Sequence, residues 1–270
     1  MKVSILLPAF KRPALLNLGL SSYVNNIPTY DYEILVLNDG IPDETESVCE
    51  KYKNLGLNVR YIFTGQRNLD GVIKSRVPGF ALNIGFKQAT GELITLSCPE
   101  VFHLNNAIDL NVKRYLESPR STMVIPSMVY FDQTNVTTSK LLQSSNLNNE
   151  EININQLMGG NFGFCHSEMP YLFTTAKQNF IDIGGYDEDF IGYAGEDSDI
   201  IARLKLTGLG YRRSGAEVIH LFHEGTNDGG YHWDNPRWVH NWNLLNERKD
   251  IIIRNAGREW GVLEYENKEK

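Results

Sequence analysis

The sequence predicts an α/β fold with a mixed, mainly parallel sheet flanked by helices. In the first hundred residues, short apolar runs alternate with segments of helical spacing, a rhythm typical of parallel strands joined by crossover helices. Residues 3–10 and 32–37 are apolar almost without interruption, as expected of strands buried on both faces. The chain has 270 residues, 41% of them hydrophobic and 22% charged, which excludes a disordered, collagen-like or coiled-coil protein.

The N-terminal part divides into four expected strands and three expected helices. Pro13 suits the first turn of a helix, because an N–H at that position would have no partner within the helix. Ala89-Thr90-Gly91 is a fitting end for the third helix. The expected strands are residues 3–10, 32–37, 59–63 and 92–96, and the expected helices are residues 14–23, 44–53 and 80–88.

Beyond residue 100 the pattern is less regular. We expect strands at residues 122–130 and 217–222, and a helix at residues 198–207 that Gly208 and Gly210 would end. Residues 134–156 are rich in Asn, Ser and Gln, which predicts a long surface excursion, and residues 159–163 predict a loop or a bulged strand. One or two C-terminal helices are expected to carry the four tryptophans, Trp233, Trp238, Trp242 and Trp260.

Charge and cysteine content narrow the class of protein. With 26 Lys and Arg against 33 Asp and Glu, the net charge is −7, so we expect no nucleic-acid partner. The three cysteines lie far apart without a CxxC motif, which argues against a disulfide framework and makes a cytoplasmic location the expectation. No apolar stretch approaches the roughly 20 residues of a membrane span, and Pro8 interrupts the apolar start, which favours a strand over a signal peptide. Peripheral association with a membrane stays open.

Polar side chains follow several expected strands, at the edge where parallel α/β sheets bind ligands. Asp39 follows the second strand, where its carboxylate could accept hydrogen bonds from a ribose or a base, or simply form a turn before Gly40. Glu100 follows the fourth strand and by itself would be a solvated loop residue. Together with His220, however, it would suit Mn, Mg or Zn.

Two further pairs have both a structural and a chemical interpretation. His220 and His223 would point to opposite faces of a regular strand, so one of them is expected to be the metal ligand unless the strand ends before His223. A structural role for either histidine stays open. Glu196 and Asp197 open the helix expected at residues 198–207, where they would either interact with the helix dipole or supply a general base. A helix N-terminus is expected to lower the pKa of Asp197.

Taken together, these segments resemble the family 2 glycosyltransferases of the GT-A fold over most of residues 1–225. The strand Val3-Ser4-Ile5-Leu6-Leu7-Pro8-Ala9-Phe10, the strand Glu33-Ile34-Leu35-Val36-Leu37-Asn38-Asp39-Gly40 and the helix at residues 79–92 resemble the family's donor-binding half. The most specific segments are Ile183-Gly184-Gly185-Tyr186-Asp187-Glu188-Asp189-Phe190 and Gly195-Glu196-Asp197-Ser198-Asp199. They resemble the galactosyltransferase segment that holds the acceptor and the catalytic base.

The resemblance implies a GT-A domain over residues 1–225, with a nucleotide-binding half to about residue 102 and an acceptor half over residues 103–225. Residues 226–270 would be a Trp-rich extension packed on the same domain. The implied activity is an inverting transfer of a sugar from a nucleotide-diphosphate donor, with a UDP-sugar favoured, to a glycan, a lipid-linked glycan or another hydroxyl acceptor. The implied site comprises the base Asp197 and its neighbour Glu196, the donor-binding residues Pro8, Ala9, Phe10, Arg12, Asp39, Asn83 and His223, the metal ligands Glu100 and His220, and the acceptor-binding residues Gly185 and Tyr186.

Two tryptophans extend the acceptor hypothesis. Trp233 and Trp238 follow the Gly-rich residues 225–230 and would either stack on an acceptor sugar or pack the last helix on the core. The sequence departs from the family at the metal motif DxD, which falls on Cys98-Pro99-Glu100. Glu100 can replace the last Asp, but Cys98 replaces the first, so we expect Mn or Mg to be held weakly without nucleotide. Cys98 also favours the alternative of a non-catalytic module that binds nucleotide sugar or glycan, whereas Glu196 and Asp197 favour catalysis.

Overall fold

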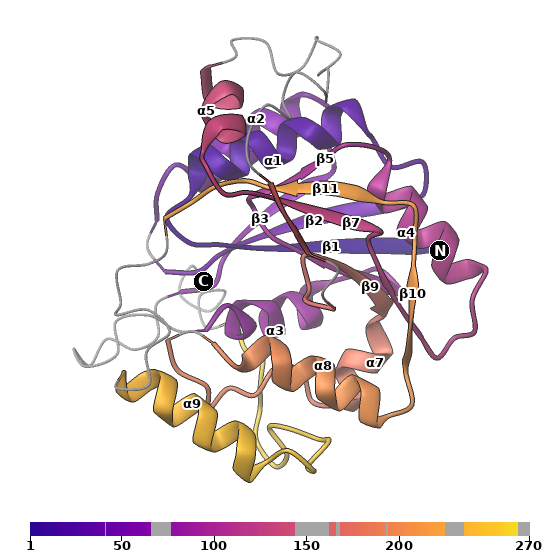
Figure 1. The fold of residues 1–270 in the computed structure, drawn as a ribbon, viewed down its shortest axis with the longest axis vertical. Coiled ribbons are helices and arrows are strands. Elements are labelled where there is room, and N and C mark those ends of the chain that lie inside the picture. The colour runs from indigo at the N-terminus through magenta and orange to yellow at the C-terminus, as the bar shows by residue number, and fades with distance from the viewer. Residues whose placement is uncertain are drawn as a thin grey trace, which may run out of the picture.

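The fold is a layered α/β arrangement, seen in a computed structural model that describes residues 1–40, 42–65, 77–143, 162–165, 168–192, 194–224 and 235–263. A seven-stranded sheet lies between two groups of helices (Figure 1). Its strands are β1 (Lys2–Ala9), β2 (Asp31–Asn38), β3 (Val59–Phe63), β4 (Leu93–Ser97), β6 (Thr122–Ile125), β9 (Leu172–Ala176) and β10 (Gly210–Arg213). A second sheet comprises β5 (Val101–His103), β7 (Met128–Asp132), β8 (Phe162–Cys165) and β11 (Glu217–His220).

The large sheet is mainly parallel, as the sequence predicts. Its strand order is β10-β6-β9-β4-β1-β2-β3, and β9 alone runs antiparallel to its neighbours. Because β1, β2 and β4 are parallel neighbours, their carboxyl ends meet at one edge, where Asp39 and Glu100 follow them. The smaller sheet has the order β5-β11-β7-β8 and places the end of β11 beside the start of β5.

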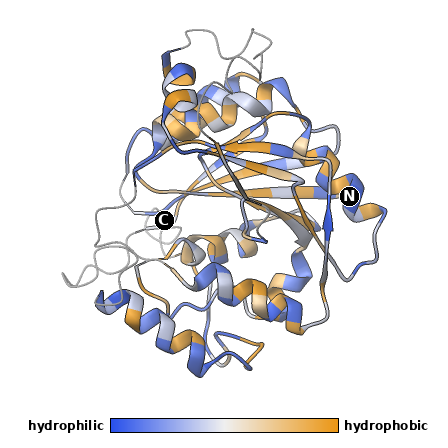
Figure 2. Ribbon diagram, in the orientation of Figure 1, coloured by the Kyte–Doolittle hydropathy of each residue, from blue (hydrophilic) through white to orange (hydrophobic). Residues whose placement is uncertain are grey.

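The helices cover both faces of the large sheet. They are α1 (Pro13–Asn25), α2 (Thr45–Asn54), α3 (Pro78–Gln88), α4 (Ala107–Leu116), α5 (Val136–Gln143), α7 (Lys177–Asp182), α8 (Glu196–Leu206) and α9 (Pro236–Glu247). Ile5 and Leu7 of β1 pack into the core with α1, α2 and α4, whereas Leu6 packs into the core with α3, α7 and α8. Burial on both faces explains the uninterrupted apolar run of β1, and Figure 2 shows the hydrophobic residues concentrated in the strands and the adjoining helix faces.

The first hundred residues fold into the predicted elements, with ends that differ by one to a few residues. Beyond them, two predictions are wrong. Trp238 and Trp242 lie on α9, but Trp260 lies outside the helices of the described residues. Residues 122–130 are two strands in different sheets. The chain leaves β6 at Pro126 and Ser127, and the Ser127 N–H donates to the Ala216 carbonyl instead of a strand partner. The excursion expected at residues 134–156 begins with the helix α5, and its remainder from residue 144 lies outside the described residues.

Residues 248–263 pack against residues 183–199 through buried ion pairs. The Arg254 guanidinium, only 3% exposed, lies 2.7 Å from a carboxylate oxygen of Asp199 and 3.0 Å from one of Asp187. Arg203 on α8 also pairs with Asp199, at 2.7 Å. Within the described residues, no helix is both long enough and apolar enough to cross a membrane.

Candidate functional site

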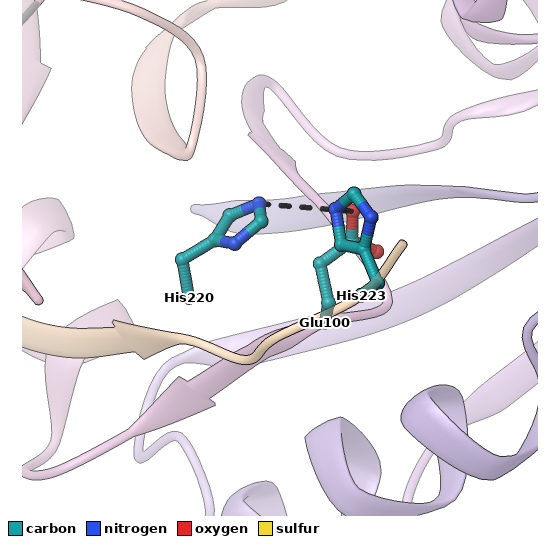
Figure 3. Close-up of side chains that lie close together, drawn as sticks. All are labelled: Glu100, His220 and His223. Carbon is teal, nitrogen blue, oxygen red and sulfur yellow. Dashed lines mark ion pairs between the residues drawn. The ribbon is translucent and has the colours of Figure 1, made fainter. Parts of the chain in front are cut away.

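A carboxylate and two imidazoles converge at the edge where β4 and β11 end. Glu100 Oε1 lies 3.3 Å from His223 Nε2 and 3.7 Å from His220 Nε2, and one ligand atom from each residue lies within 4.8 Å of the others (Figure 3). The His220 ring is fixed by its neighbours: it stacks on Phe131, with centroids 4.9 Å apart, and meets the edge of Tyr171. We refer to Glu100, His220 and His223 as the histidine–glutamate cluster.

The end of β11 brings both histidines to the same carboxylate. The strand ends at His220, so the alternation of a regular strand no longer applies at His223. The next residue, Leu221, donates its N–H to the Glu100 carbonyl at 2.8 Å, which ties this segment to the turn that carries the carboxylate. The structure thus meets the condition under which both histidines could take part: the two rings lie 5.2 Å apart and face the same carboxylate.

The carboxylate of the cluster is ionised near neutral pH, which suits a cation. Burial would raise the pKa of Glu100, but the hydrogen bond from His223 and the charge of Arg12 outweigh it and lower that pKa to about 2. Burial lowers the pKa of His220, so its imidazole is neutral near pH 7. Arg12 Nη1 lies 2.7 Å from Glu100 Oε1, a contact between residues 88 apart in the sequence.

These side chains fit a divalent transition metal. A carboxylate and two imidazoles suit Mn, Zn or Fe better than Mg, which prefers oxygen ligands. The second oxygen of Glu100, Oε2, is buried and has no hydrogen-bond partner among the described residues, as expected of an atom that binds a ligand. The residues present therefore fit such an ion, which Glu100, His220 and His223 would hold.

A second acidic group, the adjacent carboxylates Glu196 and Asp197, lies at the start of α8. Glu196 is 6% exposed, and its Oε2 has no hydrogen-bond partner within the part of the chain that the structure describes. Asp197 Oδ1 accepts a hydrogen bond from the Tyr186 hydroxyl at 3.0 Å. Tyr186 is fully buried and stacks on Phe86, so its hydroxyl is a fixed donor.

The expected low pKa of Asp197 is wrong. Burial raises its pKa, and the bond from Tyr186 compensates only in part. Burial and the adjacent charge of Asp197 also raise the pKa of Glu196. At this helix N-terminus, the loss of water therefore outweighs the helix dipole. Carboxylates with raised pKa values are stronger bases, and the pair is suited to holding one proton between them.

The loop before α8 has an unusual backbone that α9 holds in place. Ala194 and Gly195 have φ angles of +78° and +94°, and the first is a strained conformation for a residue with a side chain. Asn241 on α9, 1% exposed, donates from its side-chain amide to the carbonyls of Ile191 and Ala194, at 2.7 and 2.9 Å. No sequence pattern singled out Asn241.

Cys98 interacts electrostatically with both Glu100 and Asp197. Burial and the nearby carboxylates of Glu100 and Asp197 raise the pKa of its thiol, which therefore stays neutral. Cys98 therefore lies near enough to Glu100 and to Asp197 to interact electrostatically with both. The thiol occupies a position at which an Asp would add a further negative charge.

Four of the expected donor residues lie at the ends of β1 and β2, namely Pro8, Ala9, Phe10 and Asp39. Asp39 donates its N–H to the Ala9 carbonyl at 2.7 Å, and its Oδ1 accepts a bond of 3.4 Å from Thr64. Phe10 packs against Gly40, where a Cβ would lie 2.5 Å from the ring, which restricts this position to glycine. Pro8 lies just before this corner, at the end of β1. Whether any of these residues binds a nucleotide stays a prediction.

The structure gives three predicted ligand residues internal roles. Asn83 is fully buried, and its amide group donates to the Tyr186 carbonyl and accepts from the Tyr186 N–H, so it holds this part of the chain in place, while its contact with a donor stays a prediction. Gly185 has a φ of +68°, and a Cβ there would lie 2.3 Å from the Asn83 amide oxygen. Tyr186 is buried and donates its hydroxyl to Asp197, and a contact between Tyr186 and an acceptor stays a prediction. Trp233 lies outside the described residues.

Comparison with known proteins identifies the family. Residues 4–180 match the model of glycosyl transferase family 2, and residues 171–224 match a model described as the N-terminal domain of galactosyltransferase. The chain belongs to glycosyl transferase family 2. The second match spans the β9–α8 region and the end of β11, and so includes Asp197, His220 and His223.

Several curated glycosyltransferases are similar to this family 2 domain in sequence. A chondroitin synthase of Escherichia coli is 24% identical over 254 residues, covering 81% of this chain and 34% of that protein. A validoxylamine A glucosyltransferase of Streptomyces hygroscopicus subsp. jinggangensis is 22% identical over 227 residues, covering 77% of this chain and 52% of that protein. The chain thus spans between a third and about half of the length of these relatives.

Solved structures confirm the GT-A fold of the domain. GalNAc-T7, crystallised with UDP, GalNAc and Mn²⁺, superposes with a TM-score of 0.58 at 11% identity, covering 92% of this chain and 48% of that one. The mannosyltransferase PcManGT from Pyrobaculum calidifontis, crystallised with GDP-Man and Mn²⁺, gives a TM-score of 0.52 at 15% identity, covering 91% of this chain and 64% of that one.

Proposed function

We propose that this domain transfers a sugar from a nucleotide-diphosphate donor, a UDP-sugar by preference, to a hydroxyl of a glycan or lipid-linked glycan, with inversion at the anomeric carbon. The observation that carries the proposal is the pair Glu196–Asp197, whose raised pKa values suit proton transfer, in one region with a cluster suited to a cation. The UDP, GDP-Man and Mn²⁺ bound by proteins of the same fold support the donor class.

Asp197 is the general base in this mechanism. Its ionised carboxylate accepts the proton of the acceptor hydroxyl as the oxygen attacks the anomeric carbon, a contribution of typically about 10²–10⁴-fold in rate. Tyr186 donates to Oδ1 and so leaves Oδ2 to receive the proton. A single displacement of this kind, with one base on the face opposite the leaving group, inverts the configuration.

Glu196 stays neutral more readily than Asp197, because burial and the charge of Asp197 both raise its pKa. In its protonated form it is a hydrogen-bond donor that can orient an acceptor oxygen. When bound, a divalent ion at Glu100, His220 and His223 would neutralise charge that develops on the leaving diphosphate. Arg12 supplies a guanidinium at the same edge, a group well suited to phosphate oxygens.

The Asp197→Asn variant tests the proposal, because it keeps the shape of the side chain and removes the base. Release of nucleotide diphosphate would be followed with a panel of UDP- and GDP-sugars, glycan acceptors and Mn²⁺. We expect kcat to fall by at least about 100-fold. Calorimetry should give an unchanged affinity for UDP, since the base faces the acceptor.

Two results would contradict this assignment. Near-normal turnover by Asp197→Asn would move the base to Glu196. Nucleotide-sugar binding by the wild-type protein, with no transfer or hydrolysis for any donor, would support the second candidate. That candidate is a binding module of the same fold, and the neutral Cys98 in place of a family Asp favours it.

A further inference from the structure

Arg12 forms an ion pair with Glu100, the carboxylate that would bind a metal ion. Its Nη1 is 2.7 Å from Glu100 Oε1, the same oxygen that faces His223 at 3.3 Å and His220 at 3.7 Å. The Glu100 side chain is 6% exposed, so its negative charge requires a positive partner nearby. With Arg12 in place, that charge is already neutralised in this structure.

The arginine can leave this contact by a movement of its side chain. Its backbone is fixed, because Arg12 immediately precedes α1 and its carbonyl accepts a bond of 3.0 Å from the Leu16 N–H. The Arg12 side chain is 25% exposed, in contrast to the 6% of Glu100, so part of it reaches the surface of the edge. A long, flexible side chain on a fixed backbone can therefore change partners.

A divalent cation and the guanidinium compete at this position. A cation held by Glu100, His220 and His223 would bring two positive charges next to the charge of Arg12, with a single carboxylate to balance three. Repulsion in a poorly hydrated site is strong, which disfavours the ion while Arg12 stays. A diphosphate supplies the missing negative charge and offers the guanidinium bidentate oxygen partners.

We propose that Arg12 occupies the place of the cation on Glu100 in the donor-free protein and moves to the diphosphate when donor and cation bind. Arg12 is then the positioning residue that couples the two ligands, and by linkage each ligand raises the affinity for the other. The inference rests on the proposed function for the identity of the anion. The competition for Glu100 itself rests only on the contacts of this chain.

The decisive measurement is the affinity for Mn²⁺ alone, taken from the loss of the free-ion signal in electron paramagnetic resonance. Arg12→Gln should bind Mn²⁺ tighter than the wild type by about tenfold or more, within the usual range of coupling between sites. A merely structural role for Arg12 would give the opposite result, since a disrupted site binds the ion more weakly. Arg12→Lys, which keeps the charge, should stay close to the wild type.

Lys11→Gln is the matched control. Lys11 is the neighbouring cation, is exposed, and lies over the Phe10 ring at 5.1 Å instead of on Glu100. Its removal changes the net charge equally, yet should alter the Mn²⁺ affinity by no more than about twofold, because solvent screens exposed charges. Adding UDP should raise the Mn²⁺ affinity of the wild type by a larger factor than that of Arg12→Gln.

Three outcomes would overturn the inference. In the first, Arg12→Gln binds Mn²⁺ no more tightly than the wild type. In the second, Lys11→Gln gains as much Mn²⁺ affinity as Arg12→Gln. In the third, Glu100→Gln keeps the Mn²⁺ affinity of the wild type, which would place the ion elsewhere. Failure of the proposed function looks different: no donor is turned over by the wild type, while the gain in Mn²⁺ affinity of Arg12→Gln persists.

Discussion

Removal of the Tyr186 hydroxyl should make Asp197 harder to ionise. The Tyr186→Phe variant deletes the donor that lies 3.0 Å from Asp197 Oδ1 and keeps the ring that stacks on Phe86. The bond to Tyr186 favours the charged carboxylate, so its loss leaves the effect of burial unopposed. We therefore expect the pKa of Asp197 to rise further above its ordinary value.

The size of the change follows from the strength of the lost bond. A hydrogen bond to a charged group contributes about 1.5–3 kcal/mol. Since one pKa unit corresponds to about 1.36 kcal/mol, the expected rise is about 1–2 units. A base must be deprotonated to act, so kcat/KM is lost as the pH falls through the pKa of Asp197, and this acid limb should move to higher pH by about 1–2 units.

The pH profile of kcat/KM between about pH 5 and 9 measures this shift, with the acceptor below its KM. Tyr52→Phe is the matched control, because Tyr52 is also fully buried and donates its hydroxyl to the Asn17 carbonyl at 2.6 Å, in the other core cluster. Its loss should lower stability without moving the acid limb. An unshifted limb in a folded Tyr186→Phe protein would refute the assignment of Asp197 as the base.

Two further predictions concern the nucleotide and the C-terminal segment. Asp39→Ala should weaken UDP binding by about tenfold without changing the fold, because one charge-assisted hydrogen bond is lost. Calorimetry that shows an unchanged affinity for UDP would remove Asp39 from the donor site. Arg254→Met should lower the free energy of unfolding by about 3–5 kcal/mol in urea, because it removes the buried guanidinium that Asp187 and Asp199 share. The half-exposed Arg258→Met should cost less than about 1 kcal/mol. Equal costs would show that the buried pairs do not hold the C-terminal segment.

The N-terminal half was predictable because its signals are local. The apolar run of β1 and the helical spacing that follows Pro13 each mark one element, and parallel pairing then fixes where Asp39 and Glu100 lie. The later elements were harder. The strand β9 and the helix α7 follow each other without a break, and β6 and β7 are separated only by Pro126 and Ser127, so a single proline was the signal that divides them.

The contacts that complete the site join distant parts of the chain. Arg12 meets Glu100 across 88 residues, and Asn241 meets Ile191 across 50, and neither pair leaves a spacing pattern in the sequence. Whether the two histidines can face the same carboxylate depends on where β11 ends, and the sequence could not fix that end at His220. The pKa of Asp197 could not be predicted from its place at a helix N-terminus, because burial by tertiary packing decides its sign.

The neutral thiol of Cys98 explains how two acidic groups with opposite behaviour share one edge. Glu100 is fully ionised because Arg12 and His223 stabilise its charge. Asp197 and Glu196 resist ionisation because desolvation outweighs the hydrogen bond that Tyr186 donates to Asp197. An ionised Asp at position 98 would interact with both groups, since the thiol already lies within electrostatic reach of each. It would raise the pKa of Asp197 further and add a ligand for a cation. With cysteine there, one guanidinium is enough to neutralise Glu100, and the affinity for a metal ion comes to depend on the negative charge that the donor brings.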